Sequence, residues 1–448
     1  MVPILPERPP FVLRARLLTP LAAGGTQYEA DARLEVDAEG RITNAGAWTD
    51  ATTTDPDASV IDLRPLVLLP GMVDLHVHLP QLPNAGVGAG LDLLTWLQRY
   101  IFPLERDFDE AAADRLAPLA FKAFAAAGTT TALMYGAVYE PSLDASFRAA
   151  EAHGIRAVIG KVMMDRGSYD ERLPESRILV RSLRQSEDLC RRWHGKDRGR
   201  LRYAFTPRFA VSCSGEMLRE SAALARQYGA YWQTHLSEDR FEIEEVARLH
   251  PGSLDYLDVY DIAGALGPRT IMAHAIHLSD REVARIAESD TAIAHCPASN
   301  LFLASGAMNL TRYLDADIRV GLGSDVSAGP ELSIFANMRA GAYIQSGLRV
   351  RVGDDAIRPL DPLGWLRMAT YEGARVLGIE DETGSLEAGR DADLIAVDPR
   401  LVAPVPGVDS DDPAEVMSRL AFRPHTEMVR AAWVRGRLLE GPPGLTAA

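Results

Sequence analysis

The sequence has few cysteines and no cluster of basic residues. Its three cysteines, Cys190, Cys213 and Cys296, lie far apart, and an odd number cannot form a complete set of disulfides. The 448 residues include 47 basic and 62 acidic side chains, which give a net charge of −15 at pH 7. Such a balance argues against a nucleic acid partner, because a phosphate backbone requires clustered cations. We therefore expect a cytoplasmic protein that does not bind nucleic acid.

The sequence also lacks a long apolar run. No stretch approaches the roughly 18 residues that a membrane span requires, and the first residues, MVPILPERPP, lack the basic and apolar regions of a signal peptide. We expect no membrane partner. A hydrophobic content of 47% with 24% charged residues is ordinary for a globular protein. The length allows one large catalytic domain and a smaller one.

Both ends of the chain carry short strand-like runs separated by turn residues. In the first 67 residues, Glu39 and Gly40 have the character of a hairpin tip between two such runs. Residues 383–398 and 428–441 show the same alternation near the other end. Because each end alone is too short to bury a face, we predict that residues 1–67 and 381–448 form one small β-sandwich-like domain.

The central residues, 68–380, alternate short apolar runs with alanine-rich and leucine-rich helical stretches. The predicted strands are residues 72–78, 129–136, 156–165, 200–209, 229–238, 270–278, 291–299 and 318–325. Eight strands alternating with helices predict an α/β fold, a (β/α)₈ TIM barrel. The alternative is a doubly wound open sheet, but no G-x-G-x-x-G fingerprint follows the first strand.

Polar residues gather at the predicted carboxyl ends of these strands, where the active sites of barrels lie. The first strand ends in "HVH", and residues two apart in a strand point to the same side, so His76 and His78 aim together. The later strands end in Arg208, in His235 and Glu238, in His274 and His277, in His295, and in Asp325.

A divalent metal in a hydrolase takes three to five nitrogen or oxygen ligands and keeps a position open for water. We assign His76, His78, His235 and Asp325 as ligands and place His274 where it hydrogen-bonds the water that the metal activates. Zinc suits a histidine-rich site with one carboxylate, and iron or manganese accepts the same donors. For a single histidine, a buried structural imidazole is the commoner outcome, but a chance gathering of so many at strand ends is much less probable.

Three further residues need separate decisions. The role of His277 is open, and His295 either orients ligands or water or is a structural residue. Some barrel hydrolases bridge two metals with a carboxylated lysine at the end of the fourth strand. Lys161 lies in the third predicted strand, so a single metal is favoured.

Several motifs together resemble the amidohydrolase superfamily, and more narrowly its guanine deaminase family. They are "PGMVDLHVHLPQ", "LLTWLQRYIFPLE", "GKVMMD", "TPRFAVSCS", "HLSEDRFEIEEVARLHP", "AHAIHLS", "HCPASNLFLASGAMN" and "GLGSD", and "GRDADLIAVD" resembles the carboxyl-terminal β segment of the superfamily. The similarity runs from about residue 65 to residue 400. The stretches "HLPQ", "WLQRYIFPLE" and "TPRF" in that order are more specific than the metal motifs.

The resemblance implies hydrolysis of guanine to xanthine and ammonia with one zinc ion per subunit. Asp325 would ligate the metal and take a proton from the water, and Glu238 would carry protons to the ring nitrogen and to the departing amine. On its spacing alone, Glu238 could equally be an exposed acidic residue. The family members commonly form homodimers, which we expect here.

The same resemblance assigns substrate recognition to Gln81, Arg208 and Phe209, which offer donors and an aromatic face to a purine-like small molecule. Trp96 and Phe102 would form a wall or lid over the pocket, although aromatic residues at helical spacing are more often core.

Two stretches depart from the guanine deaminase pattern. Where the family has a Gly-Glu-Gln triplet, this chain has Gly90, Leu91 and Asp92, and where it has a glycine-rich turn, this chain has "DVSAGP". Deamination of a pterin, of 8-oxoguanine or of an s-triazine is therefore the alternative activity. A binuclear cyclic amidase is disfavoured, because the fourth predicted strand does not supply the lysine that such an enzyme requires. A non-catalytic scaffold is also disfavoured, because it would have lost candidate metal ligands, whereas this chain has all of them.

Overall fold

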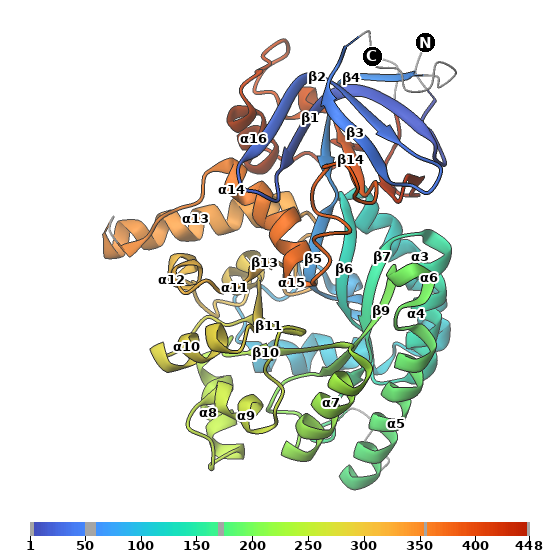
Figure 1. The fold of residues 1–448 in the computed structure, drawn as a ribbon. Coiled ribbons are helices and arrows are strands. Elements are labelled where there is room, and N and C mark those ends of the chain that lie inside the picture. The colour runs from blue at the N-terminus through green and yellow to red at the C-terminus, as the bar shows by residue number, and fades with distance from the viewer. Residues whose placement is uncertain (1–3, 50–59, 169–173, 354–355, 446–448) are drawn as a thin grey trace.

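The structure is a computed structural model that describes residues 4–49, 60–168, 174–353 and 356–445. It consists of a barrel with a smaller sheet above it, and both chain ends lie at this smaller sheet (Figure 1). Within the described residues, none of the helices combines the length and the apolar character that crossing a membrane requires.

The barrel contains the eight strands that the sequence predicts, all parallel and in chain order around it. They are β5 (Met72–His78), β6 (Thr129–Tyr135), β7 (Arg156–Gly160), β9 (Leu201–Pro207), β10 (Tyr231–Leu236), β11 (Thr270–His274), β12 (Ala292–His295) and β13 (Val320–Leu322), and the short β8 (Val162–Met163) pairs with β9. Backbone hydrogen bonds join the last strand to the first: Asp325 N donates to His76 O at 2.7 Å, and His78 N donates to Val326 O at 3.1 Å. The barrel prediction is confirmed.

The apolar run before His76 forms two strands rather than one. Residues Val60–Pro70 form β4 in the smaller sheet, and β5 of the barrel starts at Met72. Gly71 makes the change of direction, and a Cβ at this position would lie 1.9 Å from Thr130 Oγ1. The chain therefore requires glycine where it passes between the two sheets.

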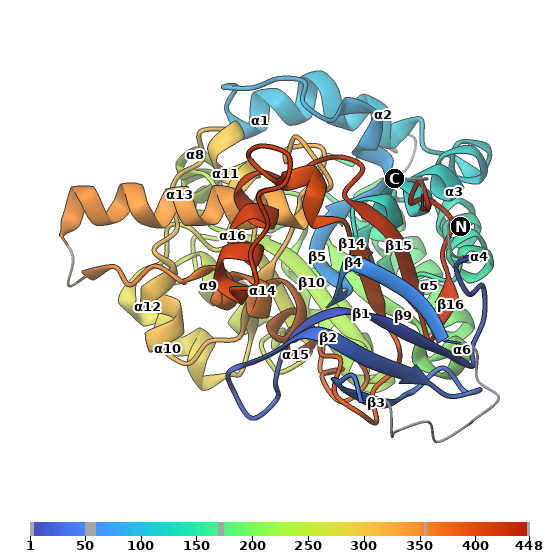
Figure 2. The same cartoon turned by 90° about the horizontal axis from the view of Figure 1, so that it is seen from above.

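The helices lie outside the two sheets, most of them around the barrel and α16 beside the smaller sheet (Figures 1 and 2), with η1 and η5 in 3₁₀ form and η2 and η4 in π form. They are η1 (Leu79–Asn84), α1 (Leu93–Trp96), η2 (Leu97–Ile101), α2 (Phe102–Arg106), α3 (Glu110–Ala126), α4 (Glu140–His153), α5 (Glu175–Trp193), α6 (Lys196–Gly199), α7 (Gly215–Tyr228), α8 (Arg240–Leu249), α9 (Tyr256–Ile262), α10 (Asp280–Glu288), α11 (Pro297–Phe302), α12 (Leu310–Asp315), α13 (Ile334–Val352), α14 (Pro362–Arg367), η4 (Met368–Glu372), α15 (Gly373–Val376), η5 (Pro399–Val402) and α16 (Pro413–Phe422).

Helix α7 illustrates why these stretches fold as predicted. The Ser214 hydroxyl accepts the N–H of Met217 at 3.1 Å and caps the first turn. Gly229, with a φ of +60°, ends the helix in the left-handed conformation that glycine adopts without strain. Between these ends, Leu218, Ala222 and Ala225 recur at helical spacing and are buried against the barrel.

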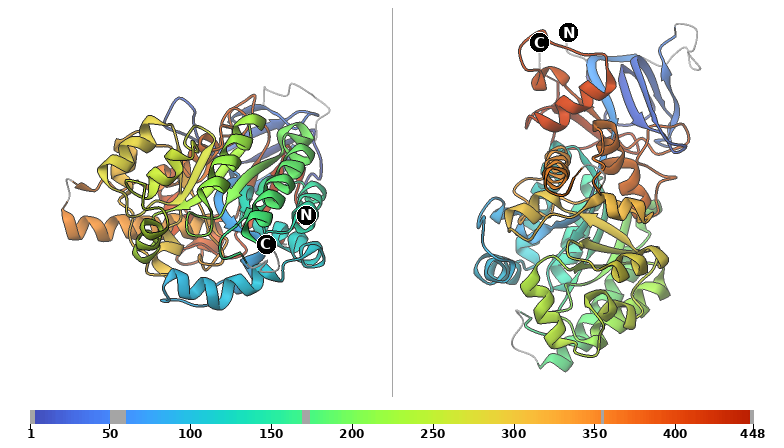
Figure 3. Two further views of the ribbon diagram at one scale, coloured as in Figure 1. Left: turned by 90° about the horizontal axis from the view of Figure 1, so that it is seen from below. Right: turned by 90° about the vertical axis from the view of Figure 1, so that its left-hand side faces the viewer.

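Both chain ends contribute to the smaller sheet, as predicted. Its order is β16 (Arg437–Leu438), β15 (Val429–Val434), β14 (Leu394–Val397), β4, β1 (Phe11–Pro20), β2 (Thr26–Val36) and β3 (Ile42–Ala47). The hairpin tip between β2 and β3 includes Gly40, whose φ is +83° and whose N–H donates to Asp37 O at 3.1 Å. Figure 3 shows the sheet above the end of the barrel. The division of the chain at residues 67 and 381 stays a prediction.

A buried arginine ties the segment between the two sheets to the barrel. The Arg156 guanidinium, on β7, is fully buried and donates to three carboxylates: to Asp393 at 2.9 Å, to Asp391 at 2.8 Å and to Glu382 at 2.7 Å. Burial disfavours its charge, but the three carboxylates outweigh burial and raise the pKa of Arg156. The cation is thus compensated on all sides.

We expect Arg156→Met to lower the free energy of unfolding by about 3 to 5 kcal/mol, because it leaves the fully buried Asp393 carboxylate without its cation. Asp391 and Glu382 would keep their ion pairs with Arg435 and Arg202. Arg248→Met is the matched control. Arg248 is 68% exposed in its ion pair with Glu245, so its loss should cost less than about 1 kcal/mol. Guanidinium unfolding followed by tryptophan fluorescence measures both. Equal stabilities of the two variants would contradict the structural role of Arg156.

Candidate active site

The polar residues predicted at the strand ends meet at one end of the barrel. His76 and His78 belong to β5, His235 to β10 and His274 to β11, and Asp325 follows β13. All five are buried. Strands far apart in the chain bring them together because the barrel closes β13 onto β5.

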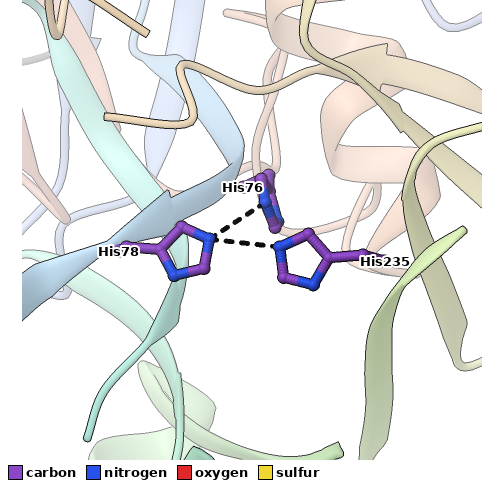
Figure 4. Close-up of side chains that lie close together, drawn as sticks. All are labelled: His76, His78 and His235. Carbon is purple, nitrogen blue, oxygen red and sulfur yellow. Dashed lines mark hydrogen bonds between the residues drawn. The ribbon is translucent and has the colours of Figure 1, made fainter. Parts of the chain in front are cut away.

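Three imidazoles converge through their Nε2 atoms (Figure 4). Nε2 of His78 lies 3.3 Å from Nε2 of His76 and 3.3 Å from Nε2 of His235. Oδ1 of Asp325 lies 3.2 Å from His76 Nε2 and 3.4 Å from His78 Nε2. Four ligands at about 2.1 Å from a zinc ion in tetrahedral geometry are about 3.4 Å apart, so these spacings fit a bound cation.

The protonation of these rings also suits a metal. Burial lowers the pKa of His76, although Asp325 opposes the shift, and burial together with the neighbouring histidines lowers the pKa of His78 and His235 well below the usual value. His235 Nδ1 donates to the Arg208 carbonyl at 2.6 Å, so its Nε2 presents a lone pair. Neutral imidazoles with lone pairs at one point are what a divalent metal binds.

Asp325 is held as an anion. Burial acts to raise its pKa, but His76, His274 and the Ser299 hydroxyl outweigh burial and lower the pKa of Asp325 to about 2. The neighbouring Ser324 donates to Asp74 through its N–H at 2.9 Å and its hydroxyl at 2.5 Å. Asp74 also accepts the N–H of His76 at 3.2 Å. One carboxylate therefore connects β5, which carries His76, to the turn after β13, which carries Asp325.

Glu238 and His274 lie beside this cluster. Glu238 Oε2 is 3.4 Å from His274 Nε2, and His274 Nε2 is 3.8 Å from Asp325 Oδ2. Burial, followed by the charge of Asp325, raises the pKa of Glu238 well above the usual value. Glu238 is therefore buried rather than exposed, and its raised pKa favours the protonated carboxylic acid form.

The structure also decides where the remaining candidates lie. His277 turns away from the cluster, and its Nε2 contacts Ser305 O at 2.8 Å. His295 is fully buried, and burial lowers its pKa to about 3. The Lys161 ammonium donates to the Ser182 hydroxyl at 2.8 Å and to Val162 O at 3.4 Å.

A pocket opens directly over the cluster. Gln81, Arg208 and Phe209, which we predicted to bind substrate, line it together with Trp96, which we predicted as its wall, whereas Phe102 is not among the lining residues. Its lining is His78, Gln81, Leu93, Trp96, Leu97, Arg208, Phe209, His235, Glu238, Glu242, Asp325 and Ala328. Trp96 is buried, and its indole N–H donates to Val87 O at 3.0 Å, which fixes the ring in the pocket wall.

Sequence reasoning missed Glu105, a fully buried residue of α2. Its Oε1 accepts the Gln81 amide at 2.7 Å, and its Oε2 accepts Arg208 Nη1. Glu105 thus orients the two polar residues of the pocket and neutralises Arg208. The signal was a lone carboxylate in the apolar stretch "WLQRYIFPLE", where an unpaired charge would be costly.

Comparison with known proteins agrees with this geometry. The amidohydrolase family model matches residues 67–439. A probable guanine deaminase of Deinococcus radiodurans is 38% identical over 382 residues, 84% of each chain. The Escherichia coli guanine deaminase is 34% identical over 394 residues, 85% of this chain and 84% of that protein.

This chain belongs to the guanine deaminase family of the amidohydrolases. The crystal structure of a C. acetobutylicum guanine deaminase with guanine in its active site has a TM-score of 0.88 and 30% identity, and the match covers 96% of this chain and 99% of that one. The family resemblance of the motifs is thereby confirmed, and the protein is a metal-dependent hydrolase.

The brace made by Asp74 has a measurable consequence. We expect Asp74→Asn to weaken zinc affinity by about tenfold or more, because the amide NH₂ that replaces Oδ2 cannot accept the hydrogen bond of the Ser324 hydroxyl. Asp62→Asn, at a site 48% exposed on β4, is the control and should leave zinc affinity unchanged. Competition with a chromogenic chelator measures both. Unchanged affinity in Asp74→Asn would show that the brace does not position the ligands.

Proposed function

We propose that this protein hydrolyses guanine to xanthine and ammonia with one zinc ion per subunit. The observation that carries the proposal is the position of Gln81, Arg208 and Phe209 in a pocket whose floor is the histidine cluster and Glu238. A guanine deaminase of known structure with 30% identity binds guanine in its active site, which supports the same substrate here.

In this proposal, His76, His78, His235 and Asp325 hold the metal. Three neutral nitrogens and one carboxylate are donors that zinc prefers, and iron or manganese would accept them as well. When bound, such an ion lowers the pKa of a water molecule at its open position. Asp325 takes a proton from the attacking water, and His274 Nε2 accepts a hydrogen bond from it.

Glu238 supplies the proton that the ring requires. A purine carbon that bears an amine is a poor electrophile until its ring nitrogen is protonated, and Glu238, kept protonated by burial, faces the pocket. The ring carbon gains the oxygen of water and loses its amino group as ammonia. The two protons of the water restore Glu238 and complete the ammonia, so the protein ends as it began.

The pocket suits a flat, neutral ring. Arg208 and Gln81 offer donors to a carbonyl oxygen and ring nitrogens, and Phe209 offers a face for stacking. Because Glu105 neutralises Arg208, the pocket binds a polar ring without requiring an anion. Trp96, Leu93 and Leu97 exclude water from the reaction.

The nearest alternative is the same reaction on a pterin, on 8-oxoguanine or on an s-triazine, since the same donors serve those rings. The homodimer stays a prediction, which sedimentation velocity tests directly. Cytoplasmic location likewise stays a prediction.

Ammonia release by the zinc-loaded protein tests the substrate and the role of Glu238 together. We expect guanine to be preferred over 8-oxoguanine, isoxanthopterin and melamine, and we expect Glu238→Gln to lower kcat by about 10² to 10⁴ fold. Glu244→Gln changes an exposed glutamate of the same region and should keep full activity. Turnover of a pterin or triazine without turnover of guanine would overturn the substrate, and an active Glu238→Gln would overturn the proton transfer.

Metal analysis tests the ligand set. We expect about one zinc per chain in the native protein and less than about a tenth of that in His78→Ala, because three ligands bind far more weakly than four. Chelation should abolish activity, and added zinc should restore it. His425→Ala removes an exposed histidine and should keep the zinc. Two metals per chain, or full zinc content in His78→Ala, would contradict the assignment.

A further inference from the structure

One short segment contacts all three residues to which we assign catalytic roles, Asp325, His274 and Glu238. Helix α11 and the loop after it carry three neutral polar side chains, Ser299, Asn300 and Ser305, all buried. Each contacts a different partner, and these partners, Asp325, His274 and Glu238, follow or end three different strands of the barrel.

Ser299 sets the rotation of the Asp325 carboxylate. Its hydroxyl donates to Asp325 Oδ2 at 2.6 Å, while Oδ1 faces His76 and His78. The two oxygens are therefore distinguished. Oδ1 points to the predicted metal position, and Oδ2 lies on the side of His274 at 3.8 Å.

Asn300 sets the tautomer of His274. Its Oδ1 lies 2.9 Å from His274 Nδ1, and an amide oxygen can only accept. The imidazole proton therefore sits on Nδ1, and Nε2 presents its lone pair towards Glu238 Oε2 at 3.4 Å.

Ser305 sets the direction of the Glu238 carboxyl group. Its hydroxyl donates to Glu238 Oε1 at 3.1 Å, so Oε1 is an acceptor and the acid proton is directed to Oε2. Ser305 is itself held by His277, whose Nε2 donates to Ser305 O at 2.8 Å. The loop that contains Ser305 is closed by Gly306 N, which donates to Asn300 O at 3.3 Å.

The fit around Gly306 explains why this loop adopts one conformation. Its φ is +149°, and a Cβ there would lie 2.9 Å from Ile276 Cγ2 and 3.0 Å from His277 Cε1. A larger residue would displace His277 and, with it, the carbonyl of Ser305. This contact gives His277, whose role the sequence left open, a position in the site.

We propose that the segment Ser299–Ser305 is an orienting element that sets the hydrogen-bonding direction of Asp325, His274 and Glu238, with Ser299, Asn300 and Ser305 as positioning residues and His277 as the support of Ser305. The proposal rests on the proposed function. The three partners come from strands β10 and β11 and from the turn after β13, and one rigid segment beside them removes their rotational freedom before substrate binds.

The test compares Ser299→Ala, Asn300→Ala and Ser305→Ala in the zinc-loaded full-length protein with guanine as substrate. Each should lower kcat by about tenfold, the effect of one lost hydrogen bond, while KM stays within about threefold and zinc content is unchanged. Ser299→Thr and Ser305→Thr keep the hydroxyl and should recover most of kcat. Because His277 acts through Ser305, the double variant His277→Ala/Ser305→Ala should be no slower than Ser305→Ala.

Ser333→Ala is the matched control. Its hydroxyl accepts the N–H of Ala336 and caps α13, and Ser333 is not among the residues that line the pocket, so this variant should lose stability and keep kcat. Wild-type kcat in all three alanine variants, loss of zinc in parallel with kcat, or no recovery by threonine would each overturn the proposal. If Glu238→Gln and His274→Ala were themselves fully active, the proposed function would fail instead, and the two failures are thereby distinguished.

Discussion

The site depends on the convergence of four buried, unprotonated donor atoms on one point. The three imidazole Nε2 atoms and Asp325 Oδ1 are buried, and neighbouring atoms of this group lie 3.2 to 3.4 Å apart. A cation is the partner that makes this arrangement favourable, and the barrel supplies the convergence. Closing β13 onto β5 places Asp325 beside His76, and the carboxylate of Asp74 holds that junction through three hydrogen bonds.

Buried charges outside the proposed metal position are also paired with charges of opposite sign. Burying Glu105 and Arg208 together gives the pocket polar groups of fixed direction without a net charge. Arg156 is likewise buried with carboxylates that compensate its charge, where the smaller sheet meets the barrel. Neither constellation belongs to the reacting groups, yet each determines where a neighbouring element lies. Glu105 does so for Gln81 and Arg208, and Arg156 does so for the segment that leads into β14.

The strand ends and the histidines were predictable because both follow from local chemistry. An apolar run that ends in alternating polar residues indicates a buried strand with a functional end, as in "MVDLHVH". Orientations across the pocket were not predictable, because they depend on contacts between distant residues. Ser305 and Glu238 are 67 positions apart, and Gln81 and Glu105 are 24 apart. The point at which the apolar run before His76 divides between two sheets also depends on tertiary packing, here that of Gly71 on Thr130.

The sequence by itself determined the barrel, because periodicity and strand-end position are local properties, and its motifs determined the family and with it the reaction class. It also led to the proposed metal ligands, because residue type at a strand end is visible in the sequence. The tertiary structure alone decided how those side chains face one another. In the folded chain, His277 contacts the Ser305 carbonyl, and Glu105 accepts hydrogen bonds from Gln81 and Arg208. The segment Ser299–Ser305 contacts three residues that follow or end separate strands. A hydrogen bond depends on the relative orientation of its donor and acceptor, and for residues far apart in the chain that orientation is set only by the tertiary fold.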